Sequence, residues 1–210
     1  MPCTSEKYKT NYYFQKKNEQ SPIVFIHGVG LTKEIWSPQV KFFNNHNILT
    51  YDLLGHGKTP LEKVRLNLED FTKQLSNLLK ELKIKKIHLV GFSLGSLIAR
   101  HFAAEHNDKL SSLVLYGSIY KRSEEQKRVV QNRFELIKTN KPIAKDRAVR
   151  RWFSDKFLRE NKEIYNKMFS ILEENDHVNL LKAYKIFVNY EDDDKLLSNI
   201  NTNTLVTTGQ

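Results

Sequence analysis

Ser93 is the residue of this 210-residue chain whose surroundings most clearly indicate chemistry. It lies in Gly91-Phe92-Ser93-Leu94-Gly95, between an apolar run that ends at Val90 and a helix-forming run that begins at Leu97. A serine at such a strand–turn–helix junction sits in strained backbone, its hydroxyl projects above the sheet edge, and its flanking positions must be small. The helix start also directs free N–H groups at negative charge formed there. The run therefore predicts a nucleophilic serine.

The elements that would position Ser93 alternate between strands and helices. Apolar runs at 23–26, 48–51, 86–90 and 110–116 predict strands, the first of them continuous enough to be buried on both faces. Helical spacing of apolar residues predicts helices at 36–44, 68–82 and 94–106, and an alternating piece at 10–14 predicts an edge strand or half of a hairpin. This order predicts an α/β fold with a doubly wound, mostly parallel sheet.

The character of the chain changes after Tyr120. Charged helical runs at 131–138, 147–158, 164–172 and 180–190 occupy a segment with no convincing strand, and a short helix is expected within 192–199. So long a helical insertion between two strands is typical of a lid over a site. A further buried strand is expected at 204–209. We expect a core over residues 1–120, a helical cap after the sixth strand over 121–194, and a return to the core over 195–210.

Composition narrows the classes of partner. The formal net charge is +10, but lysine and arginine are mixed with acidic residues rather than gathered in a stripe, which argues against a nucleic-acid partner. No apolar run approaches the ~18 residues of a membrane span, and the first residues lack the apolar core of a secretory signal. The single cysteine, Cys3, excludes an internal disulfide and fits a reducing compartment, so we expect a cytoplasmic protein without membrane contacts.

Four landmarks in sequence carry a family resemblance. They are His27-Gly28-Val29-Gly30, Asp52-x-x-Gly55-His56-Gly57, Gly91-Phe92-Ser93-Leu94-Gly95 and Leu205-Val206-Thr207-Thr208-Gly209, each at a predicted strand end. In this order the chain resembles the α/β-hydrolase fold superfamily, of the fold-1 type.

The resemblance implies roles for particular residues. Ser93 would be the nucleophile, and the backbone N–H groups of Val29 and Leu94 would form an oxyanion hole for a tetrahedral intermediate. It implies a structural loop role for His27, and Asp52 and His56 are expected to be turn and rim residues. It also implies no cofactor and no metal.

A second resemblance lies in the cap. Arg151-Trp152-Phe153-Ser154-Asp155-Lys156-Phe157 is similar to the R-W-F-x-x-x-F pattern of 3-oxoadipate enol-lactonases. The resemblance implies that Arg151 meets a substrate carboxylate and that Trp152 walls the pocket. The alternative is a packed cap helix with a solvated arginine.

Serine requires a base, and the base requires an orienting acid. In this fold the acid and the histidine follow the nucleophile in that order, and we expect both beyond Gln210. A relocated acid at Glu124 or Glu125 would still leave the histidine absent. We expect a fragment that lacks the final strand and helix, inactive and poorly soluble by itself; the alternative is a short pseudoenzyme.

The predicted function is hydrolysis of a small carboxylic ester or lactone by Ser93. Two alternatives stay open at this point. One is a C–C bond hydrolase or a cofactor-free haloperoxidase on the same fold, and the other is a non-catalytic scaffold that binds a ligand or a partner. The expected partner is a small molecule, and the sequence leaves the oligomeric state open.

Overall fold

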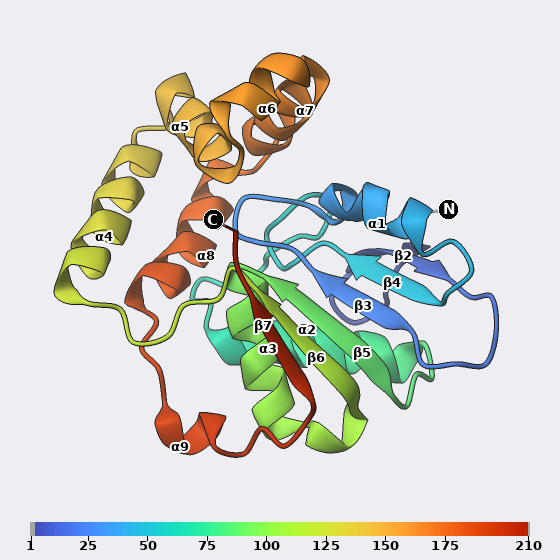
Figure 1. Ribbon diagram of the computed structural model, residues 1–210. Coiled ribbons are helices and arrows are strands. Elements are labelled where there is room, and N and C mark those ends of the chain that lie inside the picture. Colours follow the sequence, from blue (N-terminus) through green and yellow to red (C-terminus); the bar gives the residue numbers. More distant parts are fainter. Residues whose placement is uncertain (1–2, 210) are drawn as a thin grey trace.

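The computed structural model describes residues 3–209, and its centre is one seven-stranded sheet of order β1-β2-β4-β3-β5-β6-β7 (Figure 1). From β4 to β7 neighbouring strands run parallel, whereas β1 and β2 pair antiparallel at one edge. The strand bounds are β1 Cys3–Thr4, β2 Asn11–Gln15, β3 Ile23–Ile26, β4 Ile48–Tyr51, β5 Ile87–Phe92, β6 Leu110–Tyr116 and β7 Thr204–Thr207. The predicted mostly parallel sheet is confirmed.

Alternation along the strands divides the apolar core between the two faces of the sheet. Val24 and Ile26 of β3 pack in the large cluster that contains α2 (Leu68–Glu81) and α3 (Leu94–Glu105). Phe25, between them, packs instead with Trp36, whose ring centroid lies 4.8 Å away. Because successive strand side chains point to opposite faces, a continuous apolar run at this strand serves both layers.

The helix expected at 36–44 is corrected in its bounds. The chain forms a 3₁₀ turn, η1, over Lys33–Trp36 and then the short helix α1 over Ser37–Phe42, with proline in its first turn. The side chain of Thr32 accepts a hydrogen bond from the Glu34 N–H and so starts η1 early. The capping hydrogen bond at Thr32 therefore starts the helical segment at Lys33, before the position at which the apolar spacing begins.

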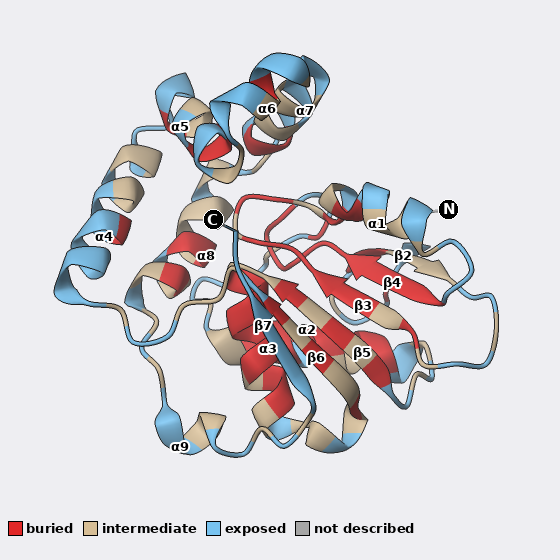
Figure 2. Ribbon diagram, in the orientation of Figure 1, coloured by how far each residue is buried: buried red, intermediate tan, exposed pale blue. Residues whose placement is uncertain are grey.

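Strand β7 corrects the expectation of a buried strand at 204–209. It pairs with β6 on one side only, and Leu205 and Val206 are 60% and 64% exposed. Figure 2 shows β7 as an exposed ribbon at the sheet edge, next to the partly buried β6. Apolar composition indicated a strand here, but burial depends on neighbouring elements, and within residues 3–209 none covers this edge.

Helices α4 to α8 lie together beyond the carboxyl ends of the strands (Figure 1). α4 packs on α8, where the rings of Phe134 and Tyr184 stack with centroids 5.7 Å apart. The predicted helical run 147–158 is two helices, because Ser154 caps α6 by accepting from the Phe157 N–H. The bounds are α4 Glu124–Lys138, α5 Pro142–Trp152, α6 Asp155–Glu160, α7 Lys162–Glu173 and α8 His177–Asn189, and the short η2 and α9 cover Asn107–Lys109 and Asp194–Leu197.

Both ends of the α4–α8 segment are fastened at Asp192. Its carboxylate forms an ion pair with the Arg100 guanidinium of α3 at 2.8 Å, and both side chains are only 6% exposed. The other carboxylate oxygen accepts a hydrogen bond of 2.7 Å from the Lys121 N–H, at the beginning of the segment. The segment therefore begins and ends at the Asp192 carboxylate, which is held against the core by Arg100.

Candidate active site

Ser93 lies in the tight turn between β5 and α3, with φ 55° and ψ −116°. The two flanking glycines allow the chain to pass so closely. A Cβ on Gly91 would lie 2.2 Å from the carbonyl oxygen of Gly95, and a Cβ on Gly95 would lie 2.4 Å from that of Ile26. Any side chain at either position would displace the strand or the helix. The close backbone contacts at Gly91 and Gly95 therefore explain why the predicted turn at Ser93 requires glycine on both sides.

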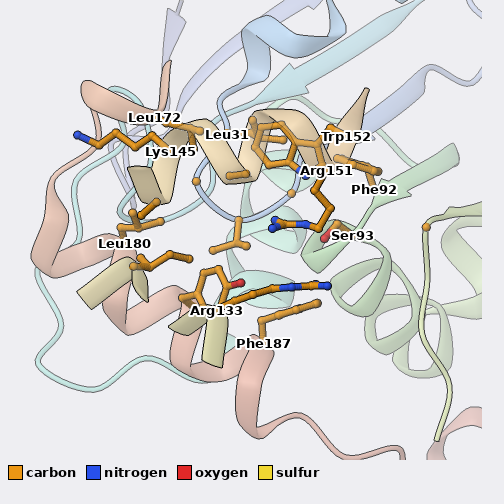
Figure 3. Close-up of a pocket in the computed structure, with 18 of the residues that line it drawn as sticks. Leu31, Phe92, Ser93, Arg133, Lys145, Arg151, Trp152, Leu172, Leu180 and Phe187 are labelled. Carbon is orange, nitrogen blue, oxygen red and sulfur yellow. The ribbon is translucent and has the colours of Figure 1, made fainter. Parts of the chain in front are cut away.

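A cavity of about 370 Å³ opens above Ser93 (Figure 3). One wall comes from the loop after β3 and from Phe92, and the facing wall comes from side chains of α4, α5, α7 and α8. The cavity thus brings Ser93 together with three other residues singled out from the sequence, which are Val29, Arg151 and Trp152. The volume suits a small organic molecule.

The loop after β3 lies directly against the serine. A Cβ on Gly28 would lie 3.2 Å from the Cβ of Ser93, which places the backbone of Gly28 and Val29 beside the turn. Leu94 is the first residue of α3, so its N–H has no acceptor within the helix. The two N–H groups predicted as oxyanion donors therefore belong to segments that meet at Ser93, and their role stays a prediction.

His27 is fully buried, and both nitrogens of its ring are occupied. Nε2 accepts from the Leu53 N–H at 3.0 Å, and Nδ1 donates to the Gly28 carbonyl at 2.8 Å. Burial lowers the pKa of His27 to about 4, and burial together with the neighbouring His27 lowers the pKa of His56 to about 3. Both rings are therefore neutral near pH 7, and His27, which joins the loops after β3 and β4, has no free nitrogen for Ser93.

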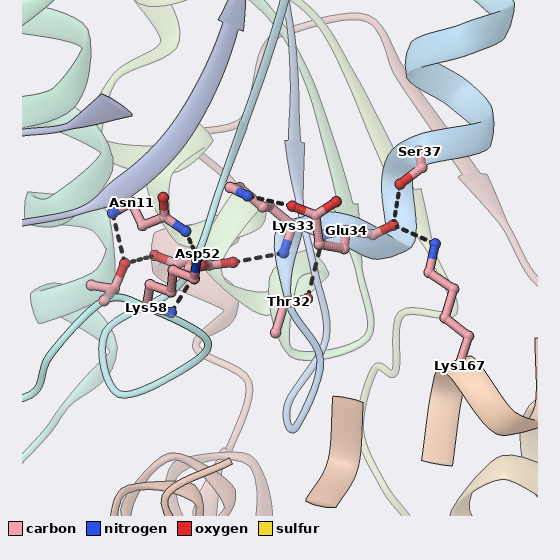
Figure 4. A network of polar contacts seen from close by, with 9 residues as sticks. Asn11, Thr32, Lys33, Glu34, Ser37, Asp52, Lys58 and Lys167 are labelled. Atoms are coloured by element: carbon pink, nitrogen blue, oxygen red, sulfur yellow. Dashed lines mark hydrogen bonds and ion pairs between the residues drawn. The ribbon is translucent and has the colours of Figure 1, made fainter. Parts of the chain in front are cut away.

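Asp52 is buried, and its carboxylate connects neighbouring loops through hydrogen bonds (Figure 4). Its carboxylate accepts hydrogen bonds from the Asn11 side-chain amide at 2.6 Å, the Lys33 N–H at 2.8 Å and the Lys58 N–H at 3.1 Å. A Cβ on Gly57, which has φ 53°, would lie 2.5 Å from this carboxylate. Asp52 thus joins the loops after β3 and β4, consistent with the turn role expected for it.

Arg151 and its neighbour Arg150 lie in different environments. The Arg150 side chain forms ion pairs with Asp146 at 3.0 Å and with Asp155 at 3.5 Å. Arg151 instead lines the cavity with its guanidinium 6.0 Å from the centre of the Trp152 ring. Surrounding protein atoms lower the pKa of Arg151 by desolvation, although the side chain stays accessible through the cavity.

Sequence reasoning missed the cavity residues of α4 and α8. Arg133, Tyr184 and Phe187 all line the cavity, and Arg133 comes from a helix that the sequence marked only by its second half. His177 also lines it, but its Nε2 lies 3.4 Å from the Lys138 carbonyl. No histidine between residues 3 and 209 is hydrogen-bonded to the Ser93 hydroxyl. The charged residues of α4 are spread around the helix, so their order along the chain gave no signal for Arg133.

With this geometry, comparison with known proteins identifies the class. Residues 21–199 match the alpha/beta hydrolase fold, and the chain belongs to that family. It is similar to (E)-2-((N-methylformamido)methylene)succinate hydrolase of Acinetobacter baylyi, 30% identical over 146 residues that cover 69% of this chain and 55% of the relative. It is also similar to 3-oxoadipate enol-lactonase 1 of the same organism, 27% identical over 91% of this chain and 71% of the relative.

Solved structures agree on the fold. The enol-lactonase of Burkholderia xenovorans superposes with a TM-score of 0.81 at 23% identity, covering 94% of this chain and 77% of the other. A hydrolase of Pseudomonas aeruginosa gives 0.83 at 19% identity, covering 95% and 76%. The chain spans about half the length of the first curated relatives, from 40% to 55%. None of the helices within residues 3–209 has the length and apolar character needed to cross a membrane.

Proposed function

We propose that this protein hydrolyses a small carboxylic ester or lactone with Ser93 as its nucleophile. The observation that carries the proposal is the strained Ser93 turn at the floor of a cavity that is walled by helices. The similarity to 3-oxoadipate enol-lactonase 1 supports this reaction class. The segment from α4 to α8 would act as the cap that separates the substrate from bulk water.

In the proposed reaction the Ser93 oxygen attacks the carbonyl carbon, and a base takes the hydroxyl proton. The N–H groups of Val29 and Leu94 would stabilise the negative oxygen of the tetrahedral intermediate, with removal of one such donor typically costing about 2.7–4 kcal/mol. The C–O bond then breaks, the proton passes to the leaving oxygen, and water releases the acyl group from serine. Arg151 and Trp152 would contact the substrate on the cap side.

The test compares single variants in the product of the complete reading frame. We expect Ser93→Ala to lower kcat/KM for p-nitrophenyl butyrate by at least about 10³-fold, because the covalent step is lost. Ser111→Ala is the matched control, since Ser111 is a half-buried serine of β6 outside the cavity. Its rate should be unchanged.

Labelling by a fluorophosphonate probe distinguishes the alternative of a non-catalytic scaffold. An activated Ser93 should form a covalent adduct that is absent in Ser93→Ala and present in Ser111→Ala. Equal esterase rates in the unmodified protein and Ser93→Ala, with no labelling of either, would contradict the proposal and favour the scaffold.

A further inference from the structure

We propose that Arg133 and Arg151 form a paired cation site for a substrate that carries two carboxylates. This inference rests on the proposed function, because it takes the cavity above Ser93 as the substrate site. Arg133 comes from α4 and Arg151 from α5, so two separate helices direct guanidinium groups into one cavity. Figure 3 shows both guanidinium groups on the side of the cavity where Ser93 lies.

In the part of the chain that the structure describes, neither arginine has a counter-ion. Within residues 3–209, Arg133 and Arg151 form no ion pair and no hydrogen bond, and no aspartate or glutamate lines the cavity. Two other arginines of the core and the helical segment do have polar partners: Arg100 pairs with Asp192, and Arg122 donates to the Phe187 carbonyl at 2.7 Å. Within residues 3–209 the cavity therefore holds the charges of Arg133 and Arg151 without an opposing carboxylate.

The two charges are close enough to oppose each other. After desolvation, the charge of Arg133 is a further cause that lowers the pKa of Arg151. Like charges in a partly desolvated site raise the free energy of the unliganded protein, and an anionic ligand removes that cost. A substrate with one carboxylate would neutralise only one of the two guanidinium groups, whereas a dicarboxylate would neutralise both.

Tyr184 joins the two arginines into one site. Its side chain is 5% exposed, its ring stacks on Phe134 next to Arg133, and both arginines lower its pKa against the raising effect of burial. Each guanidinium can hold a carboxylate by two parallel hydrogen bonds, and the phenol adds a further donor. Lys145 also lines the cavity, but it faces Glu173 at 3.8 Å. The cavity of about 370 Å³ limits the substrate to a small molecule in which two free carboxylates accompany the ester or lactone group.

The experiment measures binding, so it does not depend on hydrolysis. Succinate and succinamate differ by one carboxylate replaced with a neutral amide, and both are titrated against the unmodified chain by calorimetry in a carboxylate-free buffer. We expect succinate to bind at least tenfold more tightly than succinamate. The same preference is expected in Ser93→Ala, so a failure of the hydrolase proposal and a failure of this one are separate results.

Three charge-removing variants locate the site. Arg133→Gln and Arg151→Gln should each reduce the succinate preference to less than threefold. Arg128→Gln removes the same charge from an exposed position of α4 outside the cavity, and it should keep the full preference. Equal binding of the two ligands, or no binding of either, by the unmodified chain would overturn the inference, as would a preference that survives in both cavity variants. Tighter binding of inorganic phosphate than of succinate would overturn the dicarboxylate assignment in favour of a phosphorylated ligand.

Discussion

Gly95→Ala decides whether close backbone contact or helix propensity governs the turn at Ser93. Gly95 is the second residue of α3, and alanine in a helix is favoured over glycine by up to about 1 kcal/mol. Propensity alone therefore predicts a more stable protein. The structure predicts the opposite, because the new Cβ would lie 2.4 Å from the Ile26 carbonyl oxygen and 2.7 Å from that of His27.

The size of the effect follows from which atoms collide. Favourable contacts between heavy atoms lie at about 3.5–4.0 Å, so β3 and α3 would have to separate by roughly 1 Å. Overpacking of this kind typically costs about 1–3 kcal/mol, and the upper value is expected here because backbone, not a flexible side chain, must move. For a chain of this length each kcal/mol lowers Tm by about 2–4 °C, so we expect a fall of roughly 6–12 °C.

Thermal unfolding followed by circular dichroism measures this shift. Gly209→Ala is the matched control, because a Cβ there meets nothing within 4 Å, and its Tm should stay within about 2 °C of the unmodified chain. A Tm of Gly95→Ala equal to or above that of the unmodified chain would refute the argument. It would mean that the strand and helix at the turn are less closely packed than described.

Two further predictions concern buried charge and buried histidine. Asp192→Asn leaves the Arg100 guanidinium buried without its ion-pair partner and should lower the free energy of unfolding in urea by about 3–5 kcal/mol. The exposed control Asp194→Asn should leave it nearly unchanged, and equal losses in the two variants would contradict the buried ion pair. In the folded chain the pKa values of His27 and His56 are about 4 and 3. Below about pH 6.5 the unfolded chain therefore binds more protons than the folded chain does. The free energy of unfolding consequently falls as the pH falls. Urea titrations at pH 7.5 and 5.0 should differ by about 2 kcal/mol for each histidine, and His27→Gln should remove about half of the difference; a variant with the full pH dependence would exclude His27 as its source.

Much of the sheet was predictable because parallel strands buried on both faces leave uninterrupted apolar runs. β6 was predicted with its observed bounds, Leu110–Tyr116, and the turn at Ser93 follows from the requirement for small residues at fixed positions. These signals are local. Neighbouring residues determine the strand, the glycine turn and the serine at their junction. A single sequence is therefore enough to predict where they lie.

Features that depend on distant partners, or on a single capping side chain, were not predictable. The exposure of β7 reflects what lies beside it, and Arg133 faces the cavity only because α4 packs on α8 through Phe134 and Tyr184. The split of the helical run 147–158 depended on a single capping serine. In each case the outcome was set by a tertiary contact or by one polar side chain, neither of which hydrophobic periodicity reports.

The shared fastening of both segment ends at Asp192 has a consequence for the order of assembly. β6 and β7 are adjacent in the sheet but are separated along the chain by all the helices from α4 to α9. Closing so long a loop is entropically unfavourable, and the cost grows with loop length. Once Lys121 and Asp192 are in contact, only short stretches remain between that contact and the two strands. The helices can then form as one closed unit, and β7 joins the sheet as a nearly local event.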